Sequence, residues 1–298
     1  MSSEVNEQTR EMIFKIAKEQ GCFKKFFNAK YPKFVVAVIC PEYKSLFYSS
    51  ALSMLQEYLS EYGCEVCVAS TNFSAQTEAD LLEYYSQYSA VDGIIVINGS
   101  AAIDPHLGLP VVTLYPNQGC AGPISIRGDI SAAITAAFAH FRSRNVTDIG
   151  FIGDPQTFLK QQLLAKFGEA LGMPLREKYI CISDARFEAG GYAAMETFFK
   201  AGNLPQAIFC AYDYMAIGAI RCILDHGLSV PNDIAVIGMD DIPEAKYLNP
   251  SLSSINVNMD KTCRIAAEAI IRCLTEQPFA LSEKVTCDLH LRASTDIK

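Results

Sequence analysis

Short apolar stretches alternate with helical segments along almost the whole chain, and this alternation limits the folds open to it. The first series of predicted strands covers residues 34–40, 64–69, 93–97, 110–114 and 123–126, and the second covers 148–152, 178–182, 207–211 and 234–238. Strands separated by helices form parallel sheets whose faces the helices cover. The sequence therefore predicts an α/β fold with two doubly wound parallel sheets.

Acidic residues stand at turns within the stretch 205–252. Asp213 follows a short apolar run, at the position of an N-cap for a predicted helix over 214–226. Asp240 and Asp241 follow the next predicted strand. Ligands of open α/β sheets bind outside the carboxyl ends of the strands, so these carboxylates are candidate ligand contacts. Helix capping explains Asp213 and one of the pair equally well.

The sequence motifs of this region are also specific. AYDYMAIGA at 211–219, GLSVPNDIAVIGMDDIP at 227–243 and LNPSLSSI at 248–255 follow one another in order. These three motifs closely resemble the effector-binding core of the lactose-repressor (LacI/GalR) family of bacterial transcription regulators. Four further stretches are similar to strands of that family: 35–41, 91–96, 110–114 and 289–295.

The resemblance implies a particular domain organisation. Family members have a periplasmic-binding-protein-like (type I) fold, in which the chain passes three times between two lobes. The matching positions here are near Gly128, Asn256 and Ser282. Lobe one would comprise 34–127 plus 257–281, and lobe two would comprise 129–255 plus 283–298. The family binds a small-molecule effector, sugar-like or related, in the cleft between the lobes.

Residues 1–33 are expected to be the remnant of a headpiece helix and a linker. Residues 5–21 read as an amphipathic helix capped by Asn6, with Ile13 and Ile16 on one face. The resemblance matches this helix to the third helix of the family's DNA-binding headpiece. Operator DNA is therefore expected to be bound only through a headpiece absent from this chain, whose recognition helix would enter the major groove.

The distribution of charge agrees with this view. The chain has a net charge of −8, but residues 1–33 carry seven basic and four acidic side chains, a net +3. The remainder therefore carries a net −11. Because phosphate contacts need clustered Lys and Arg, this acidic body is not expected to bind nucleic acid generally.

Aromatic and acidic residues are the candidate effector contacts in and next to lobe one. Phe47 and Tyr48 match the paired aromatics that the family places against its ligand, and their flat faces suit a sugar ring or a nucleobase. Tyr115 is a further candidate wall residue. Asp129 matches an Asp of many family members. Packing of the first helix explains the aromatic pair, and capping explains Asp129, equally well.

Lobe two carries the remaining candidates. Asp240 matches an acidic ligand contact of the family and is preferred to Asp241, whereas Tyr212 precedes Asp213 where the family has Asn. Leu163 stands where sugar- and purine-sensing members have Arg. Arg186, followed by Phe187, would replace that cation, and the effector would then carry a carboxylate or phosphate. A solvated loop arginine is the alternative.

Composition narrows the class of protein. With 50% hydrophobic and 19% charged residues, the 298-residue chain has an ordinary globular balance. No stretch approaches the roughly 20 apolar residues that cross a bilayer, and the N-terminus does not read as a signal peptide. A cytoplasmic protein without membrane contacts is expected. The eleven cysteines are interpreted as reduced thiols in apolar positions, so no metal site, disulfide framework or cofactor is predicted.

Three functions remain in competition. We favour a regulator's sensing core that forms a homodimer, in which the effector shifts the population between two orientations of the lobes. A stand-alone solute-binding protein of the same fold is the first alternative. An enzyme is the second, but no catalytic residues are assigned, because the chain has no GxSxG, HExxH, GxGxxG or P-loop motif and its four histidines are dispersed.

Overall fold

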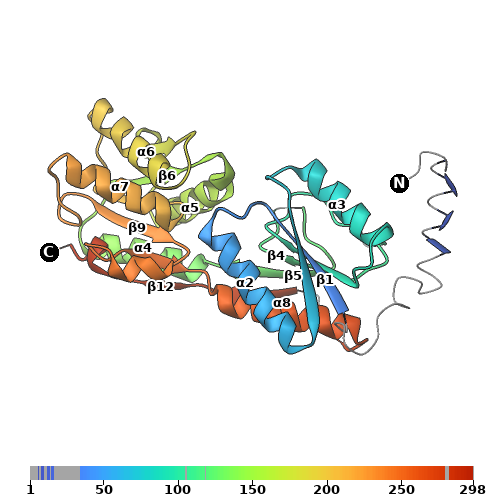
Figure 1. Cartoon of the computed structure of the whole chain (residues 1–298). Coiled ribbons are helices and arrows are strands. Elements are labelled where there is room, and N and C mark those ends of the chain that lie inside the picture. The colour runs from blue at the N-terminus through green and yellow to red at the C-terminus, as the bar shows by residue number, and fades with distance from the viewer. Residues whose placement is uncertain are drawn as a thin grey trace. The chain divides into compact units, whose positions relative to one another are not determined.

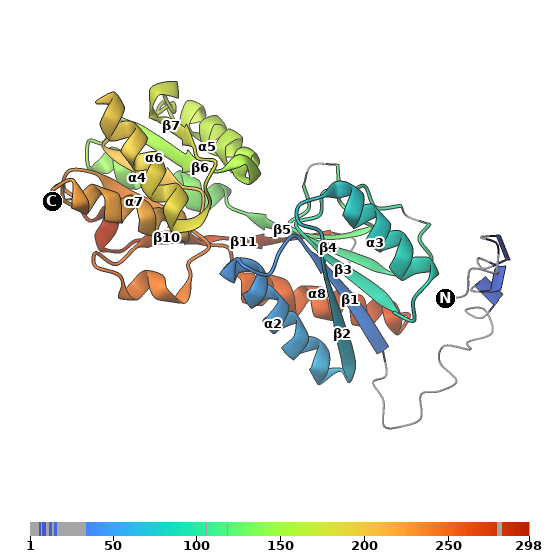
Figure 2. The same cartoon turned by 45° about the horizontal axis from the view of Figure 1, so that its top comes forward.

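The chain folds into two compact α/β units. The computed structural model describes residues 6, 8, 9, 12, 13, 15, 16, 34–104, 106–117, 119–278 and 282–297. Unit 1 consists of Met1–Gly128 and Met259–Val285, and unit 2 of Asp129–Asn258 and Thr286–Lys298. Each unit contains a six-stranded, largely parallel sheet (Figures 1 and 2). The predicted fold class is therefore confirmed.

Unit 1 is built on the strand order β11-β5-β4-β3-β1-β2. Its strands are β1 (Phe34–Cys40), β2 (Cys64–Ser70), β3 (Gly93–Ile97), β4 (Val111–Leu114), β5 (Ile124–Asp129) and β11 (Ser282–Thr286). The strands from β2 to β5 pair in parallel. Its helices are α2 (Leu46–Glu61), α3 (Ala75–Gln87) and α8 (Met259–Leu274). Helices α2 and α8 cover one face of the sheet and α3 covers the other (Figure 1).

The pattern of α8 shows why these helices pack on the sheet. Its buried residues Cys263, Ala266, Ala267 and Ile270 recur at i, i+3, i+4 and i+7, which places them on one side of the helix. They join a single apolar cluster with residues of α2 such as Leu55. Burial of this stripe removes apolar surface from water, which is the main stabilising contribution to such a unit.

Two cysteines of β2 stand at the spacing of a C-x-x-C motif. Cys64 and Cys67 are three residues apart on an extended strand, so their side chains point to opposite faces. Cys64 belongs to the cluster under α2 and α8, whereas Cys67 packs against the cluster on the other face. The pair therefore cannot share a metal ion or a disulfide without a change of the strand.

Unit 2 has the strand order β12-β10-β9-β8-β6-β7. Its strands are β6 (Ile149–Gly153), β7 (Ile180–Ile182), β8 (Ala207–Cys210), β9 (Ala235–Met239), β10 (Ser253–Asn256) and β12 (Asp288–His290). All pair in parallel except β10 and β12. Helices α4 (Ser131–Ser143) and α5 (Phe158–Ala170) lie on one face, and α6 (Phe187–Ala201) and α7 (Asp213–Asp225) on the other (Figure 1).

Glycines bring α6 and α7 into backbone contact. A Cβ atom at Gly191 would lie 1.9 Å from the carbonyl oxygen of Met215, and one at Gly218 would lie 1.9 Å from that of Glu188. Any larger side chain at either position would force the helices apart. This close approach fixes the relative position of the side chains farther along both helices.

The C-terminal part differs from the sequence prediction. The stretch 289–295 was expected to form one strand, but β12 ends at His290 and a 3-10 helix covers Ala293–Thr295. Side-chain hydrogen bonds replace the strand pairing here: Ser294 Oγ donates to the carbonyl of Val236 at 2.6 Å, and Ser253 N donates to Ser294 Oγ at 2.8 Å. The short strand β10 was missed because its buried serines give it little apolar character.

The predicted N-terminal helix lies largely outside the described residues. Within 5–21, residues 8, 9, 12, 13, 15 and 16 are helical, and Asn6 Oδ1 accepts a hydrogen bond from Thr9 N at 2.8 Å, as an N-cap does. The remainder of the segment 1–33, and with it the predicted linker, is not described. None of the described helices is both long and apolar enough to cross a bilayer.

Candidate functional site

The carboxyl ends of the parallel strands in unit 2 bring together most of the predicted site residues of that unit. Asp154 follows β6, Arg186 follows β7, Tyr212 follows β8 and Asp240 follows β9. The strands are neighbours in the order β9-β8-β6-β7, so the residues after them lie along one edge of the sheet. This edge is where ligands of open α/β sheets bind.

Asp154 is the centre of a hydrogen-bond network at this edge. Its carboxylate is fully buried, and its Oδ2 accepts from Tyr212 OH at 2.8 Å and from Arg186 Nε at 3.2 Å. The other oxygen, Oδ1, accepts from Gln156 N at 2.9 Å. A buried carboxylate needs such partners, because an uncompensated charge in an apolar interior is costly. The network therefore holds Arg186 and Tyr212 in place.

Asp154 is not among the residues predicted from the sequence, although its position carries a signal. It directly follows a fully buried strand and precedes Pro155, which begins a 3-10 turn that Asp154 caps. The strand end alone would have placed it beside the other candidates. Arg186 is consequently not a solvated loop arginine, since its guanidinium pairs with Asp154 and lies 4.7 Å from the ring centre of Phe187.

Aromatic rings line the same edge. Phe187 begins α6, and its ring meets those of Tyr212 and Tyr214 edge-on at centroid distances of 6.1 and 6.2 Å. The backbone N–H of Phe187 donates to Tyr212 OH at 3.0 Å. Phe187 has φ 59°, a left-handed conformation that is uncommon for a bulky residue. The surrounding contacts thus hold this backbone in a strained geometry, as at many binding sites.

Asp240 lies at the end of β9 in a similarly unusual conformation. Its φ is 101°, and its side chain is 12% exposed. Burial raises the pKa of the Asp240 carboxyl, and Lys160, whose Nζ lies 3.7 Å from Oδ1, opposes this effect. Lys160 also donates to the carbonyl of Ala211 at 2.8 Å. Asp240 is therefore a partly accessible acceptor with a nearby cation.

Asp213 is buried at this edge and fully bonded to the protein. It is the first residue of α7, preceded by the N-cap Tyr212, so the helix begins one residue earlier than predicted. Its buried carboxylate accepts from Ile242 N at 2.8 Å and from Ser254 Oγ at 2.6 Å. Burial, and next the charge of Asp240, raises the pKa of Asp213 well above its usual value. The side chain joins α7 to the segments after β9 and within β10.

Asp241 takes part in a separate group of charges. Its Oδ2 contacts His290 Nδ1 at 2.7 Å, and its Oδ1 lies 2.8 Å from Arg292 Nη2. Asn256 Nδ2 donates to the same Oδ2 at 3.2 Å. The structure therefore separates the two adjacent acids: Asp241 is held by three protein partners, whereas Asp240 lies near one lysine.

The predicted aromatic residues of unit 1 form a cluster at the carboxyl ends of its strands. Phe47 meets the rings of Tyr48 and Tyr115 at centroid distances of 5.2 and 5.7 Å. Tyr48 is buried and accepts a hydrogen bond from Asn98 Nδ2 at 3.0 Å through its hydroxyl. Phe73 adds a fourth ring, 6.3 Å from that of Tyr48. The rings of Phe47 and Tyr48 therefore both pack against their neighbours and lie at this edge.

Asn98 and Phe73 were not predicted as members of this group. Both stand just after a strand, Asn98 after β3 and Phe73 after β2, and both have positive φ, 55° and 62°. Tyr115, after β4, has φ 49°. Non-glycine residues in this conformation at three strand ends mark the edge as a special site, but sequence patterns do not reveal backbone angles.

Asp129 lies at the end of β5. Its Oδ1 accepts from Ser131 N at 3.1 Å, at the beginning of α4. This contact closes the turn before α4, whose N-cap is Ile130. The Asp154 carboxylate has Tyr212, Arg186 and Gln156 as its partners, and Asp129 is not one of these three.

A hollow of ≈ 440 Å³ lies elsewhere on unit 1. It is lined by residues of β1, α8 and the ends of two helices: Phe34, Tyr62, Glu268, Ile271, Arg272, Thr275 and Gln277. Phe34 is the first residue of β1, so the hollow lies at the amino end of that strand. None of the predicted site residues lines it, and ligands of parallel sheets bind at the opposite, carboxyl ends.

Comparisons with known proteins identify the family of the chain. A periplasmic binding protein-like domain family matches residues 138–295, which is more than half of the chain. The repressor PurR of Glaesserella parasuis is 25% identical over 84% of this chain and 76% of its own length. The repressor CytR of Escherichia coli K12 is 25% identical over 98% of this chain and 89% of its own.

Solved structures show the same fold. A LacI family regulator from Arthrobacter sp. FB24, in complex with lactose, superposes with a TM-score of 0.74 at 22% identity, over 88% of this chain and 99% of its own. PurR and CytR are transcription regulators, in agreement with the prediction that the chain is not an enzyme. The chain thus belongs to the periplasmic binding protein-like domain family and is an effector-binding core of the kind that LacI-family transcription regulators carry.

Proposed function

We propose that the residues at the carboxyl ends of both sheets bind one small, polyhydroxylated effector, such as a sugar or a related metabolite. The network of Asp154, Arg186 and Tyr212 is the observation that supports this most directly, because a buried carboxylate holds polar side chains at a sheet edge. In unit 1 the contribution would be aromatic, from Phe47 and Tyr115. Sugar sites combine such flat apolar faces with a few fixed polar groups.

The charges favour a neutral effector over an anionic one. Arg186 is paired with Asp154, and Lys160 lies near Asp240, so each cation at the edge of unit 2 has an acidic neighbour. A ligand with hydroxyl groups can donate to Asp240 without adding a net charge. An effector with a carboxylate or phosphate is the second candidate, because Arg186 lies at this edge.

Effector binding can be tested by calorimetry after a screen of sugars, sugar acids, sugar phosphates and nucleosides. Asp240→Asn should lower the affinity for the identified effector by about 10–100-fold, the loss of a hydrogen bond to a charged group. Phe47→Ala should lower it by about 10-fold through the loss of ring contacts. The matched controls Asp80→Asn and Tyr84→Ala, at exposed sites on α3, should bind as the natural chain does. Unchanged affinity in both site variants would refute the assignment.

We further propose that the chain is part of a cytoplasmic, homodimeric repressor whose effector alters its affinity for operator DNA. The support is the likeness to PurR and CytR, which are named as transcriptional repressors. DNA contact would come from a helix-turn-helix headpiece rather than from the acidic units described here. The alternative is a stand-alone solute-binding protein. A mobility-shift assay of the natural protein with DNA flanking its gene, with and without effector, distinguishes the two.

A further inference from the structure

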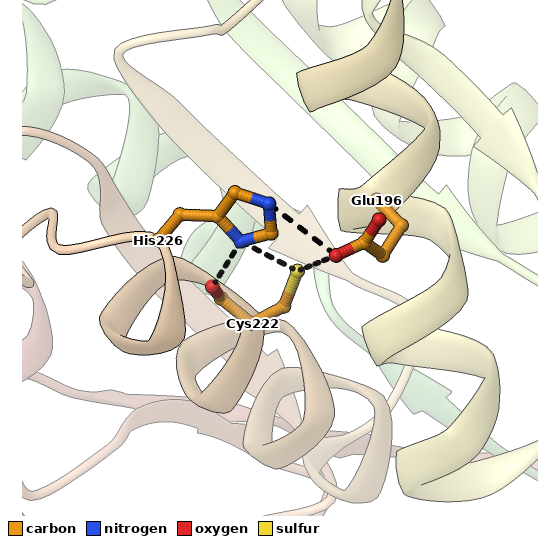
Figure 3. Close-up of side chains that lie close together, drawn as sticks. All are labelled: Glu196, Cys222 and His226. Atoms are coloured by element: carbon orange, nitrogen blue, oxygen red, sulfur yellow. Dashed lines mark hydrogen bonds and ion pairs between the residues drawn. The ribbon is translucent and has the colours of Figure 1, made fainter.

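Three side chains of types that can ligate metals converge between α6 and α7 of unit 2. Glu196 projects from α6, and Cys222 and His226 project from the end of α7 toward it (Figure 3). Their ligand atoms lie within 4.8 Å of one another. This is the one such group of three among the described residues, and its members do not belong to the candidate effector site.

We propose that Glu196, Cys222 and His226 form a binding site for Zn²⁺ or a similar divalent transition metal, which would join α6 to α7. Carboxylate, thiolate and imidazole are the three ligand types that zinc takes in proteins. Cys222 and His226 are four residues apart, a spacing that places both on the same side of a helix. Two ligands come from one helix and one from its neighbour, so the ion would span the helix pair.

Two of the three separations are close to those of tetrahedral coordination. Cys222 Sγ lies 3.8 Å from Glu196 Oε1, and His226 Nε2 lies 3.4 Å from the same oxygen. Bond lengths of about 2.3 Å to sulfur and about 2.0 Å to nitrogen and oxygen require separations of about 3.5 and about 3.3 Å. The sulfur of Cys222 lies 3.8 Å from the other ring nitrogen, Nδ1, so the Cys222 side chain must rotate toward Nε2 before all three atoms can share one ion. Water would take the fourth position.

The imidazole is already oriented for this role. His226 Nδ1 lies 3.0 Å from the carbonyl oxygen of Cys222, which can only accept, so Nδ1 carries the proton. Nε2 faces Glu196 and is therefore the ligating nitrogen, and an ion would take the place of the contact it makes with that carboxylate. A hydrogen bond from the second nitrogen to a carbonyl is the usual support of a metal-bound histidine. Phe199 stacks on the ring at 3.9 Å and 6°, which further fixes its plane.

Neighbouring groups affect how tightly an ion would bind. Lys200 Nζ lies 3.5 Å from Glu196 Oε2, the oxygen that faces away from the cluster, and competes for this carboxylate. Burial, and next the charge of Glu196, raises the pKa of the Cys222 thiol to about 12, so the ion must displace its proton. Both effects weaken binding without blocking the site. Glu196 and His226 are partly exposed, which leaves a route for the ion.

Titration of the full, reduced chain with Zn²⁺ against a chelating dye tests the proposal. We expect the natural chain to bind Zn²⁺ at one site. Each of the variants Cys222→Ser, His226→Gln and Glu196→Gln should lose more Zn²⁺ affinity than the about 10–100-fold that is lost when a residue of the outer coordination shell is changed. Cys273→Ser and His106→Gln repeat the first two changes at distant positions and should bind as the natural chain does. Circular dichroism of each variant checks its fold, and Glu196→Gln, which keeps the side-chain shape, guards against a folding artefact.

Co²⁺ provides a second measurement. A thiolate-to-cobalt absorption band should appear with the natural chain and with both controls, and should be lost in Cys222→Ser. Absence of Zn²⁺ binding to the natural chain, or equal binding by the three site variants and the controls, would overturn the proposal.

Discussion

Individual carboxylates at the edge of unit 2 have different tasks because their surroundings differ. Asp154 and Asp213 are fully buried and are held by protein donors, so they hold the neighbouring residues in position. Asp241 is tied to Arg292 and His290. Asp240 is the acid whose side chain keeps partial exposure and a strained backbone, and it is therefore the strongest candidate for effector contact.

The pH dependence of stability should report on Asp213. Because its folded-state pKa is raised, the native chain retains a proton that the unfolded chain loses above the ordinary carboxyl pKa. The free energy of unfolding from this group should therefore fall as pH rises from about 4, until the raised native pKa is passed. Asp213→Asn, which keeps an acceptor for Ile242 N, should make the profile flatter.

Urea unfolding of both chains between pH 5 and pH 8 measures this difference. Asp240 also has a raised pKa, so the variant should keep part of the slope. Parallel profiles for the two chains would show that Asp213 is ionised in the native state throughout this range.

At the scale of elements, the contact between α6 and α7 is the most constrained feature of unit 2. Gly191 and Gly218 let the backbones touch, and the phenylalanines of α4 and β8 fill the other face of the sheet. The helix pair carries Phe187 and Tyr212 at its start and the proposed metal ligands near its end. Displacement of one helix would thus affect both places.

Gly218→Ala should destabilise the protein by about 3 kcal/mol, the upper end of the usual cost of overpacking. Its Cβ would lie 1.9 Å from the carbonyl oxygen of Glu188, which is backbone and cannot move alone. Gly63→Ala is the matched control: its Cβ meets nothing within 4 Å, so only the positive φ of 73° adds a cost, of about 1 kcal/mol. Thermal or urea unfolding compares them, and equal losses would contradict the contact argument.

The whole molecule consists of two sheets, each with polar or aromatic residues at its carboxyl edge. In unit 1 these residues are mainly aromatic, and in unit 2 they are mainly charged. A ligand that contacts both would favour one relation of the units over another by its difference in affinity for the two. This is the physical basis of the proposed effector response.

A homodimer is the assembly expected for a regulator that reads a two-fold operator. Light scattering at micromolar concentration should give about twice the chain mass of 32.7 kDa. Dilution should shift the value toward the monomer if the interface is weak. A mass of one chain at every concentration would favour the stand-alone binding protein instead.

Much of the architecture follows from the sequence. Apolar stretches of strand length separated by amphipathic helices determined the α/β class, since each face must be buried, and most strand ends lie within one or two residues of the predicted ones. Strand β10 and the break after His290 escaped prediction because buried serine hydrogen bonds, rather than apolar periodicity, hold them. The sequence motifs of the LacI/GalR family identified candidate site residues at strand ends in both units.

Tertiary structure alone decided which partner each side chain has. Asp154 and Arg186 are 32 residues apart, and Glu196 and Cys222 are 26 apart, yet each pair is in contact. Likewise, folding turned Asp213 inward and left its neighbour on the sheet edge, Asp240, partly exposed. Local pattern fixes secondary structure because its energetics are local, whereas the charge, pKa and reach of a side chain depend on groups that only folding brings near it.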